Sequence, residues 1–106
     1  MHEYQLRYLP QFYHDLKRTV DYIANHLRNP QAANDLIDAT EEAILERQSG
    51  AEAFEQYHSR KEREYPYYRI YVRNYIIFYV VIPENDHKVM EIRRFLFGKS
   101  NWKGTI

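Results

Sequence analysis

Arginine and tyrosine side chains alternate along the segment between residues 67 and 75. Arg69, Tyr71 and Arg73 are spaced two residues apart, so a β-strand would place all three on one face. A guanidinium group beside aromatic rings can bind a phosphate through paired hydrogen bonds while a ring stacks on a base. The pattern equally fits Arg–Glu pairing across a solvated sheet face. The cluster therefore predicts either a nucleic-acid-binding face or ordinary cross-strand pairing.

A second group of cations lies near the end of the chain. Arg93 is spaced to share a strand face with Glu91 and Phe95, and Arg94 and Lys99 follow it. Trp102, the single tryptophan, could serve as a stacking platform, contact a partner, or anchor the tail on the core. Of these roles the anchor is favoured.

Other chemistry is weakly supported. His58, Glu62 and Glu64 could act as general bases, but a solvated, mixed-charge loop explains them better. The histidines show no metal-ligand spacing, and the chain has no cysteine, so we expect neither a metal nor a disulfide. With only 3 glycines there is no phosphate-binding glycine loop, and we expect no cofactor.

Length and composition set the broad class. The 106 residues predict one domain spanning residues 1–106, and 44% hydrophobic residues are enough for a core. Charges balance at 15 basic and 15 acidic residues, although residues 1–50 are net acidic and residues 51–106 net basic. A signal-peptide pattern and a membrane-length apolar run are both missing from the sequence. We therefore expect a soluble, cytoplasmic protein without membrane contact.

The elements that would position these residues can be read from periodicity. Residues 4–8 alternate as a short strand. Two amphipathic helical stripes follow, separated by Asn29-Pro30, which suits a helix N-cap and first turn. We expect both stripes to face the core: Phe12, Leu16, Val20, Ile23 and Leu27 in the first, and Ala33, Leu36, Ile37, Thr40 and Ile44 in the second.

Residues 51–67 have no clear period, and after them the pattern changes to strands. These cover residues 67–72, the wholly apolar residues 75–82 and residues 88–97, with turns at Arg73-Asn74 and residues 83–87. The order β-α-α-β-β-β predicts an α+β fold. In it an antiparallel helical hairpin packs on one face of a three- to four-stranded, largely antiparallel sheet, and the other face is open or covered by a partner.

At this point the chain resembles the RelE/ParE superfamily of bacterial toxins. The resemblance covers nearly the whole chain and rests on "YLPQF", "LRNPQAA", "YYRIYVRNYIIFYVV" and "EIRRFLFGKSNW". It implies the same β-α-α-β-β-β fold and makes the chain the toxin of a type II toxin–antitoxin pair. The implied partner is a cognate antitoxin that neutralises it. The implied activity is either ribosome-dependent mRNA cleavage or poisoning of DNA gyrase.

Cleavage of RNA without a metal needs a base for the 2′-hydroxyl, an acid for the leaving oxygen, and cations for the charged phosphorane. On the mRNA-cleaving hypothesis we assign catalysis to Arg69, Arg73 and Arg93. The predicted substrate contacts are Tyr71, Tyr75, Arg94, Lys99 and Trp102. The sequence leaves the general base and acid unassigned.

Two positions depart from the mRNA-cleaving pattern that the resemblance implies. The arginine expected two residues after the hairpin turn is replaced by Ile76, and the basic residue expected after Gly98-Lys99 is replaced by Ser100. These departures shift weight toward the gyrase alternative. They also leave a third hypothesis, a non-toxic homologue that binds its antitoxin and helps it repress their promoter.

Overall fold

The computed structural model describes residues 4–106, which form two helices, a five-stranded sheet and short helical turns. The first strand, β1 (Gln5–Tyr8), ends where Pro10 begins α1 (Pro10–Asp21). Proline suits this first helical position because its fixed φ is already helical and the missing N–H has no partner there. The strand predicted over residues 4–8 is confirmed.

The helical hairpin contains one irregular turn. A π-helical turn, η1 (Tyr22–His26), follows α1, and within it the N–H of Leu27 donates to the carbonyl oxygen of Tyr22 at 3.0 Å. A π-turn holds an extra residue and rotates the stripe about the helix axis. Leu27 is consequently 55% exposed, so its predicted place in the core is wrong.

The second helix, α2 (Pro30–Arg47), begins as the sequence predicts. The side-chain oxygen of Asn29 accepts a hydrogen bond from the N–H of Ala32 at 3.1 Å, and Pro30 takes the first position. A 3-10 turn, η2 (Gln48–Gly50), follows the helix.

Three long strands form the centre of the sheet: β3 (Tyr67–Val72), β4 (Tyr75–Glu84) and β5 (His87–Phe97). They pair as antiparallel hairpins. Arg73 and Asn85 take positive φ values of 53° and 48° at the two turns. The first turn lies where it was predicted. The second is tighter than expected, because β4 continues through Pro83 to Glu84 and β5 begins at His87.

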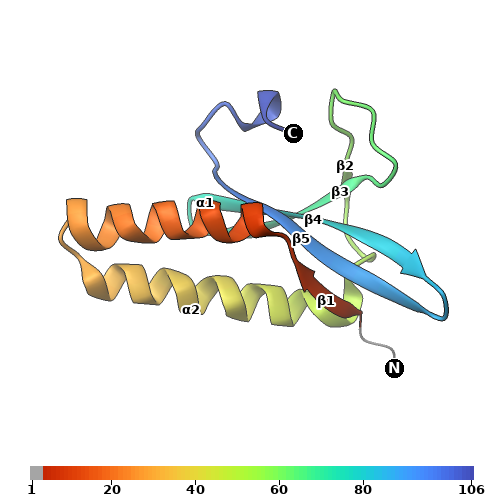
Figure 1. The fold of residues 1–106 in the computed structure, drawn as a ribbon, viewed down its shortest axis with the longest axis horizontal. Coiled ribbons are helices and arrows are strands. Elements are labelled where there is room, and N and C mark those ends of the chain that lie inside the picture. Colours follow the sequence, from red (N-terminus) through yellow and green to blue (C-terminus); the bar gives the residue numbers. More distant parts are fainter. Residues whose placement is uncertain (1–3) are drawn as a thin grey trace.

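The sheet order is β1-β5-β4-β3-β2, and β1 runs parallel to β5 (Figure 1). The sheet therefore has more strands than the three or four expected, and it is mixed. The additional strand is β2 (Gln56–Tyr57), a two-residue pairing with β3 inside the segment that showed no period. So short a strand leaves no periodic pattern in the sequence.

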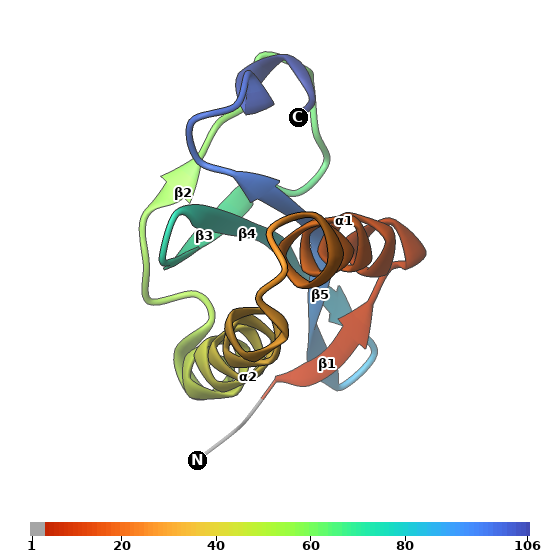
Figure 2. The same ribbon diagram turned by 90° about the vertical axis from the view of Figure 1, so that its left-hand side faces the viewer.

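One face of the sheet packs against the helices and the other against the C-terminal tail (Figures 1 and 2). The helix-side core joins Phe12, Leu36 and Ile44 to strand residues such as Ile77 and Ile92. The tail-side core joins Trp102 and Ile106 to Tyr67, Ile76, Phe78 and Val80. The expectation that the second face is open or held for a partner is therefore wrong over this region. Coverage on both faces explains why β4 is apolar almost throughout.

Candidate functional site

A β-bulge in β5 decides where its arginines point. Tyr79 pairs with Ile92 and Phe78 pairs with Arg94, which leaves Arg93 as the extra residue. Glu91 lies opposite Val80 of the tail-side core, whereas Phe95 lies opposite Ile77 of the helix-side core. The expectation that Arg93, Glu91 and Phe95 share one face is therefore wrong for Phe95, because the bulge resets the alternation.

Arg93 belongs to a charge cluster. Its Nε donates to Oε1 of Glu91 at 2.8 Å, and the carboxylate of Glu91 is buried. Arg7 on β1 approaches Glu91 at 3.3 Å and donates two hydrogen bonds to Glu84, at 2.8 and 3.0 Å. The cluster joins β1, β4 and β5 with two positive and two negative charges, so Arg93 is neutralised within the fold.

Arg94 is held by a buried carboxylate from α1. Its Nε and Nη2 donate to Asp15 at 2.7 and 3.1 Å, and the N–H of Phe95 donates to the same carboxylate at 3.0 Å. Asp15 is 1% exposed and also accepts from Gln11 and Arg18. Burial alone would raise the pKa of Asp15, but these donors, with Arg94 foremost, lower it below its ordinary value.

Arg69 is in a different situation. Its guanidinium lies over the rings of Tyr57 and Tyr71, at 5.1 and 5.8 Å from their centroids. It makes no ion pair within residues 4–106, and Tyr71 is 63% exposed. The predicted face is therefore formed by Arg69 and Tyr71, and Tyr57 from β2 joins it. Such a cation held between rings keeps its hydrogen-bond donors available.

Arg73 and Lys99 lie at the end of the sheet. Arg73 is in the β3–β4 turn and is no longer part of the strand face it was predicted to share. The N–H of Gly98 donates to the carbonyl oxygen of Asn74 at 2.7 Å, which brings this turn beside the segment that carries Lys99. Both cations are exposed, and neither forms an ion pair in the described part of the chain.

Tyr75 lines an aromatic groove at the same end of the molecule. Its ring stacks on Phe95 at 4.9 Å and lies 5.7 Å from Phe97. The groove has a volume of about 550 Å³, and Tyr22 and Phe97 stand exposed at its edge. Burial, with a smaller effect of Tyr22, raises the pKa of Tyr75, so its phenol stays protonated and can donate a hydrogen bond.

Trp102 lies in the short helical turn η3 (Trp102–Gly104) and is 8% exposed. Its ring packs 5.2 Å from Phe78 and 5.3 Å from Tyr57, and its Nε1 donates to the carbonyl oxygen of Gly98. The ring occupies the place of an anchor for the tail. A stacking role for it stays a prediction that would require the tail to move.

The structure thus divides the predicted residues into separate groups. Arg69 and Tyr71 share one surface, Arg73, Tyr75 and Lys99 lie near one end of the sheet, and the remaining three are engaged in ion pairs or packing. Sequence patterns did not place Asp15, Tyr57 or Tyr22 in these groups, because each joins a residue that is distant along the chain: Arg94, Arg69 and Tyr75, respectively.

Two carboxylates of the fold, those of Asp15 and Glu52, have pKa values shifted away from the range that suits a general base. A base that works near neutral pH needs a carboxyl pKa raised toward neutrality. The carboxyl pKa of Asp15 is lowered, and so is that of Glu52, chiefly by the hydrogen bond from Lys88. Within residues 4–106, His, Asp and Glu form no group that could hold a metal. The helices of this range do not combine the length and the continuous apolar run that a membrane span requires.

Comparison with known proteins returns one family. The family described as "ParE toxin of type II toxin-antitoxin system, parDE" matches residues 6–102, from β1 to Trp102. A search of curated proteins finds no match. The matched range contains both helices and the whole sheet except Gln5, the first residue of β1.

Proposed function

Because the chain belongs to the ParE family of toxins, whose partner in a type II toxin–antitoxin system is a cognate antitoxin, we propose that it inhibits growth by poisoning DNA gyrase. The observation that carries this choice is the pairing of Arg93 with Glu91 and of Arg94 with Asp15. Phosphorane stabilisation requires cations with charge to spare. Here the two arginines of β5 are neutralised by buried carboxylates.

Two further features support gyrase over mRNA as the target. Ile76 and Ser100 replace basic residues that the mRNA-cleaving pattern would place near the site. The lowered pKa values of Asp15 and Glu52 make these carboxylates weak bases for a ribose hydroxyl. A protein that acts by binding gyrase needs neither a base nor an acid.

A single experiment with two parallel reactions tests this proposal. The protein is added to gyrase with supercoiled DNA and ATP, and separately to ribosomes programmed with an end-labelled mRNA. We expect gyrase-dependent DNA breaks in the first reaction. In the second we expect no mRNA cleavage under conditions in which a known ribosome-dependent nuclease cuts. Cuts at the decoding site, with no effect on gyrase, would overturn the proposal.

One observation favours mRNA cleavage as the second candidate. Arg69 keeps a guanidinium without an ion pair in the described chain, held between two tyrosine rings where a phosphate and a base could bind together. On this alternative, Arg69→Ala and Arg73→Ala abolish cleavage. Lys103→Ala, which changes an exposed cation on the tail, is the matched control. Full cleavage by Arg69→Ala would remove this face as the site.

A further inference from the structure

Aromatic rings and a cation alternate across the tail side of the sheet. Trp102 meets the ring of Tyr57 edge to face, with 5.3 Å between the two ring centroids. The guanidinium of Arg69 lies 5.1 Å from the centroid of Tyr57 and 5.8 Å from that of Tyr71, which is 63% exposed. Tyr57, Arg69 and Tyr71 together are called the ring–cation row, and Trp102 supports one end of it.

The order of groups in the ring–cation row matches that of a single nucleic-acid strand, in which each phosphate lies between two bases. Unpaired bases stack on aromatic side chains whatever their sequence, while cations follow the backbone. Arg69 forms no ion pair among residues 4–106, so its charge remains for a phosphate. In a duplex the bases stack on one another instead, so the row fits an unpaired strand.

The end of the sheet beside the row is positively charged. Arg73 lies in the β3–β4 turn, two residues beyond Tyr71. Lys99 follows Gly98, whose N–H donates to the carbonyl oxygen of Asn74 in that turn at 2.7 Å. No Asp or Glu occurs in β3, in the turn after it or in the tail. The two exposed cations therefore continue the row along a path that carries no opposing carboxylate.

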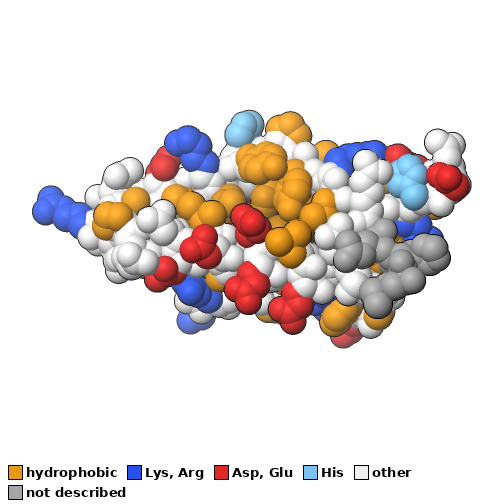
Figure 3. Space-filling view, turned by 90° about the horizontal axis from the view of Figure 1, so that it is seen from below, with side chains coloured by type: hydrophobic (Ala, Val, Ile, Leu, Met, Phe, Trp, Pro, Cys, Tyr) orange, Lys and Arg blue, Asp and Glu red, His pale blue; other side chains and the backbone are white. Residues whose placement is uncertain are grey.

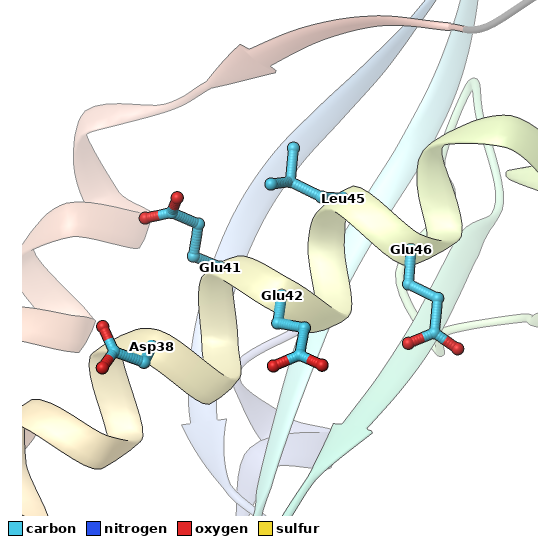
Figure 4. A pocket seen from close by; sticks show the side chains of 5 residues that line it. All are labelled: Asp38, Glu41, Glu42, Leu45 and Glu46. Carbon is cyan, nitrogen blue, oxygen red and sulfur yellow. The ribbon is translucent and has the colours of Figure 1, made fainter.

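The helix side of the molecule would repel a polyanion. One edge of α2 carries four carboxylates around Leu45 (Figure 4): Asp38, Glu41, Glu42 and Glu46. None of them forms an ion pair with a cation of residues 4–106. Figure 3 shows acidic side chains beside an apolar stripe on this side. Because the helices and the tail cover opposite faces of the sheet, the field of the protein turns the ring–cation row toward a polyanion.

We infer that the ring–cation row binds a single strand of DNA, which in the gyrase reaction is the strand left unpaired beside the break. Tyr57 and Tyr71 stack on successive bases, and Arg69 binds the phosphate between them. Arg73 and Lys99 bind phosphates further along the strand. A strand held in this way rejoins slowly, so broken DNA accumulates. The inference rests on the proposed gyrase target and names what the toxic surface contacts there.

The same surface gives no preference for RNA. A protein distinguishes RNA from DNA through the ribose 2′-hydroxyl, which a carboxylate can recognise by accepting its hydrogen bond. Since β3, the turn after it and the tail contain no Asp or Glu, the surface offers no such acceptor. An RNA strand should therefore gain nothing over a DNA strand of the same sequence.

Fluorescence anisotropy of a labelled oligonucleotide measures the binding without gyrase. We expect the protein to bind single-stranded DNA more tightly than the duplex of the same sequence, and at least as tightly as the matching RNA. Tyr71→Ala should weaken binding by at least about fivefold because base stacking is lost, whereas Tyr71→Phe keeps the ring and should bind as the parent does. Equal affinity for strand and duplex, tighter binding of RNA, or no binding would overturn the inference.

Salt dependence separates a phosphate contact from a structural role. Arg69→Gln should lower the slope of log affinity against log salt by about 0.7, the value for one phosphate contact in a single strand. Arg28→Gln removes an exposed cation between the two helices and should leave the slope unchanged. Circular dichroism and Trp102 emission establish that each variant is folded. An unchanged slope in folded Arg69→Gln would contradict the phosphate contact.

The gyrase reaction with the same variants distinguishes this inference from the proposed target. We expect Tyr71→Ala and Arg69→Gln to lower gyrase-dependent DNA breaks in parallel with strand binding. Undiminished breaks with a variant that no longer binds the strand would overturn the inference and leave the gyrase target standing. An absence of breaks with the parent protein, while it still binds the strand, would overturn the gyrase target and leave the strand binding standing.

Discussion

The contact between Asp15 and Arg94 should be the largest single electrostatic contribution to the stability of this fold. Asp15→Ala removes a 1%-exposed carboxylate and leaves the Arg94 guanidinium, whose side chain is 22% exposed, without its counter-ion. Breaking a buried pair in this way costs about 3–5 kcal/mol. The N–H of Phe95 also loses its acceptor. Against a total unfolding free energy of roughly 5–15 kcal/mol, this loss is large enough to unfold part of the population.

Urea denaturation measures the effect, and the protein carries its own probe. Trp102 is the single tryptophan and is buried against β4, so its emission reports loss of the tail and sheet together. Circular dichroism of the helices gives an independent curve. The matched control is Asp21→Ala on the same helix, which breaks an exposed pair with Lys17 and should cost only about 0.3–0.5 kcal/mol.

The pairing of Asp15 with Arg94 also predicts the stability of the double substitution. If the cost comes from leaving Arg94 unpaired, then adding Arg94→Ala to Asp15→Ala should destabilise the protein by clearly less than the sum of the two single changes. Additive losses would show that the two side chains act independently. An Asp15→Ala loss within about 1 kcal/mol of the Asp21→Ala loss would refute the assignment of a buried pair.

The titration of two carboxylates and the hydroxyl groups of Thr40 and Tyr79 allow three further tests. The pKa values of Asp15 and Glu52 are lowered in the folded protein, so both carboxylates stabilise the fold at pH values above the ordinary carboxyl range. This stabilisation is lost as the pH falls through the lowered pKa values. The urea midpoint should therefore drop in acid, and it should drop less in Asp15→Asn. Thr40→Val removes a buried hydroxyl without a partner among the described residues and should raise the free energy of unfolding by about 1 kcal/mol. Tyr79→Phe removes the donor to the carbonyl oxygen of Ala51, at 2.7 Å, and should cost about 1–3 kcal/mol.

The two substitutions at Thr40 and Tyr79 each have a comparison within the chain. Thr19→Val changes a half-exposed hydroxyl of α1 and should leave stability unaltered, and Tyr57→Phe should cost less than Tyr79→Phe because its ring is only partly buried. A urea midpoint that does not respond to acid would contradict the carboxylate argument. A Thr40→Val protein less stable than the parent would mean that its hydroxyl is satisfied in solution.

Rules that act between neighbouring residues were sufficient to predict most of the helices, strands and turns. Asn29 and Pro30 predict the start of α2 because an N-cap and a first-turn proline act on adjacent residues. The turn at Arg73 and the apolar centre of β4 also follow from neighbouring residues, and both are confirmed. The resemblance to the RelE/ParE superfamily is confirmed by the family match over residues 6–102.

The errors have a common physical origin. The π-turn that exposes Leu27 and the bulge at Arg93 each add a single residue, and β2 is only two residues long, so periodicity detects none of the three. The tail that covers the second sheet face depends on Trp102 reaching Phe78 across the fold. Pairing of Arg94 with Asp15 spans 79 residues of sequence, so nothing near either residue signals it.

The end of β1 explains why β5 carries two adjacent arginines. Pairing with β1 stops at Ile92, where the N–H of Leu9 donates to its carbonyl oxygen and the chain leaves to begin α1. Beyond Ile92 the edge of β5 has no strand to bond to, and Asp15 supplies an acceptor to the N–H of Phe95 instead. A buried carboxylate used in this way needs a counter-ion, which Arg94 provides. Arg93, pushed out by the bulge, balances Glu91 in the same manner. Both arginines are thus required by the architecture, and a search for the toxic surface should begin with Arg69, Arg73 and Lys99.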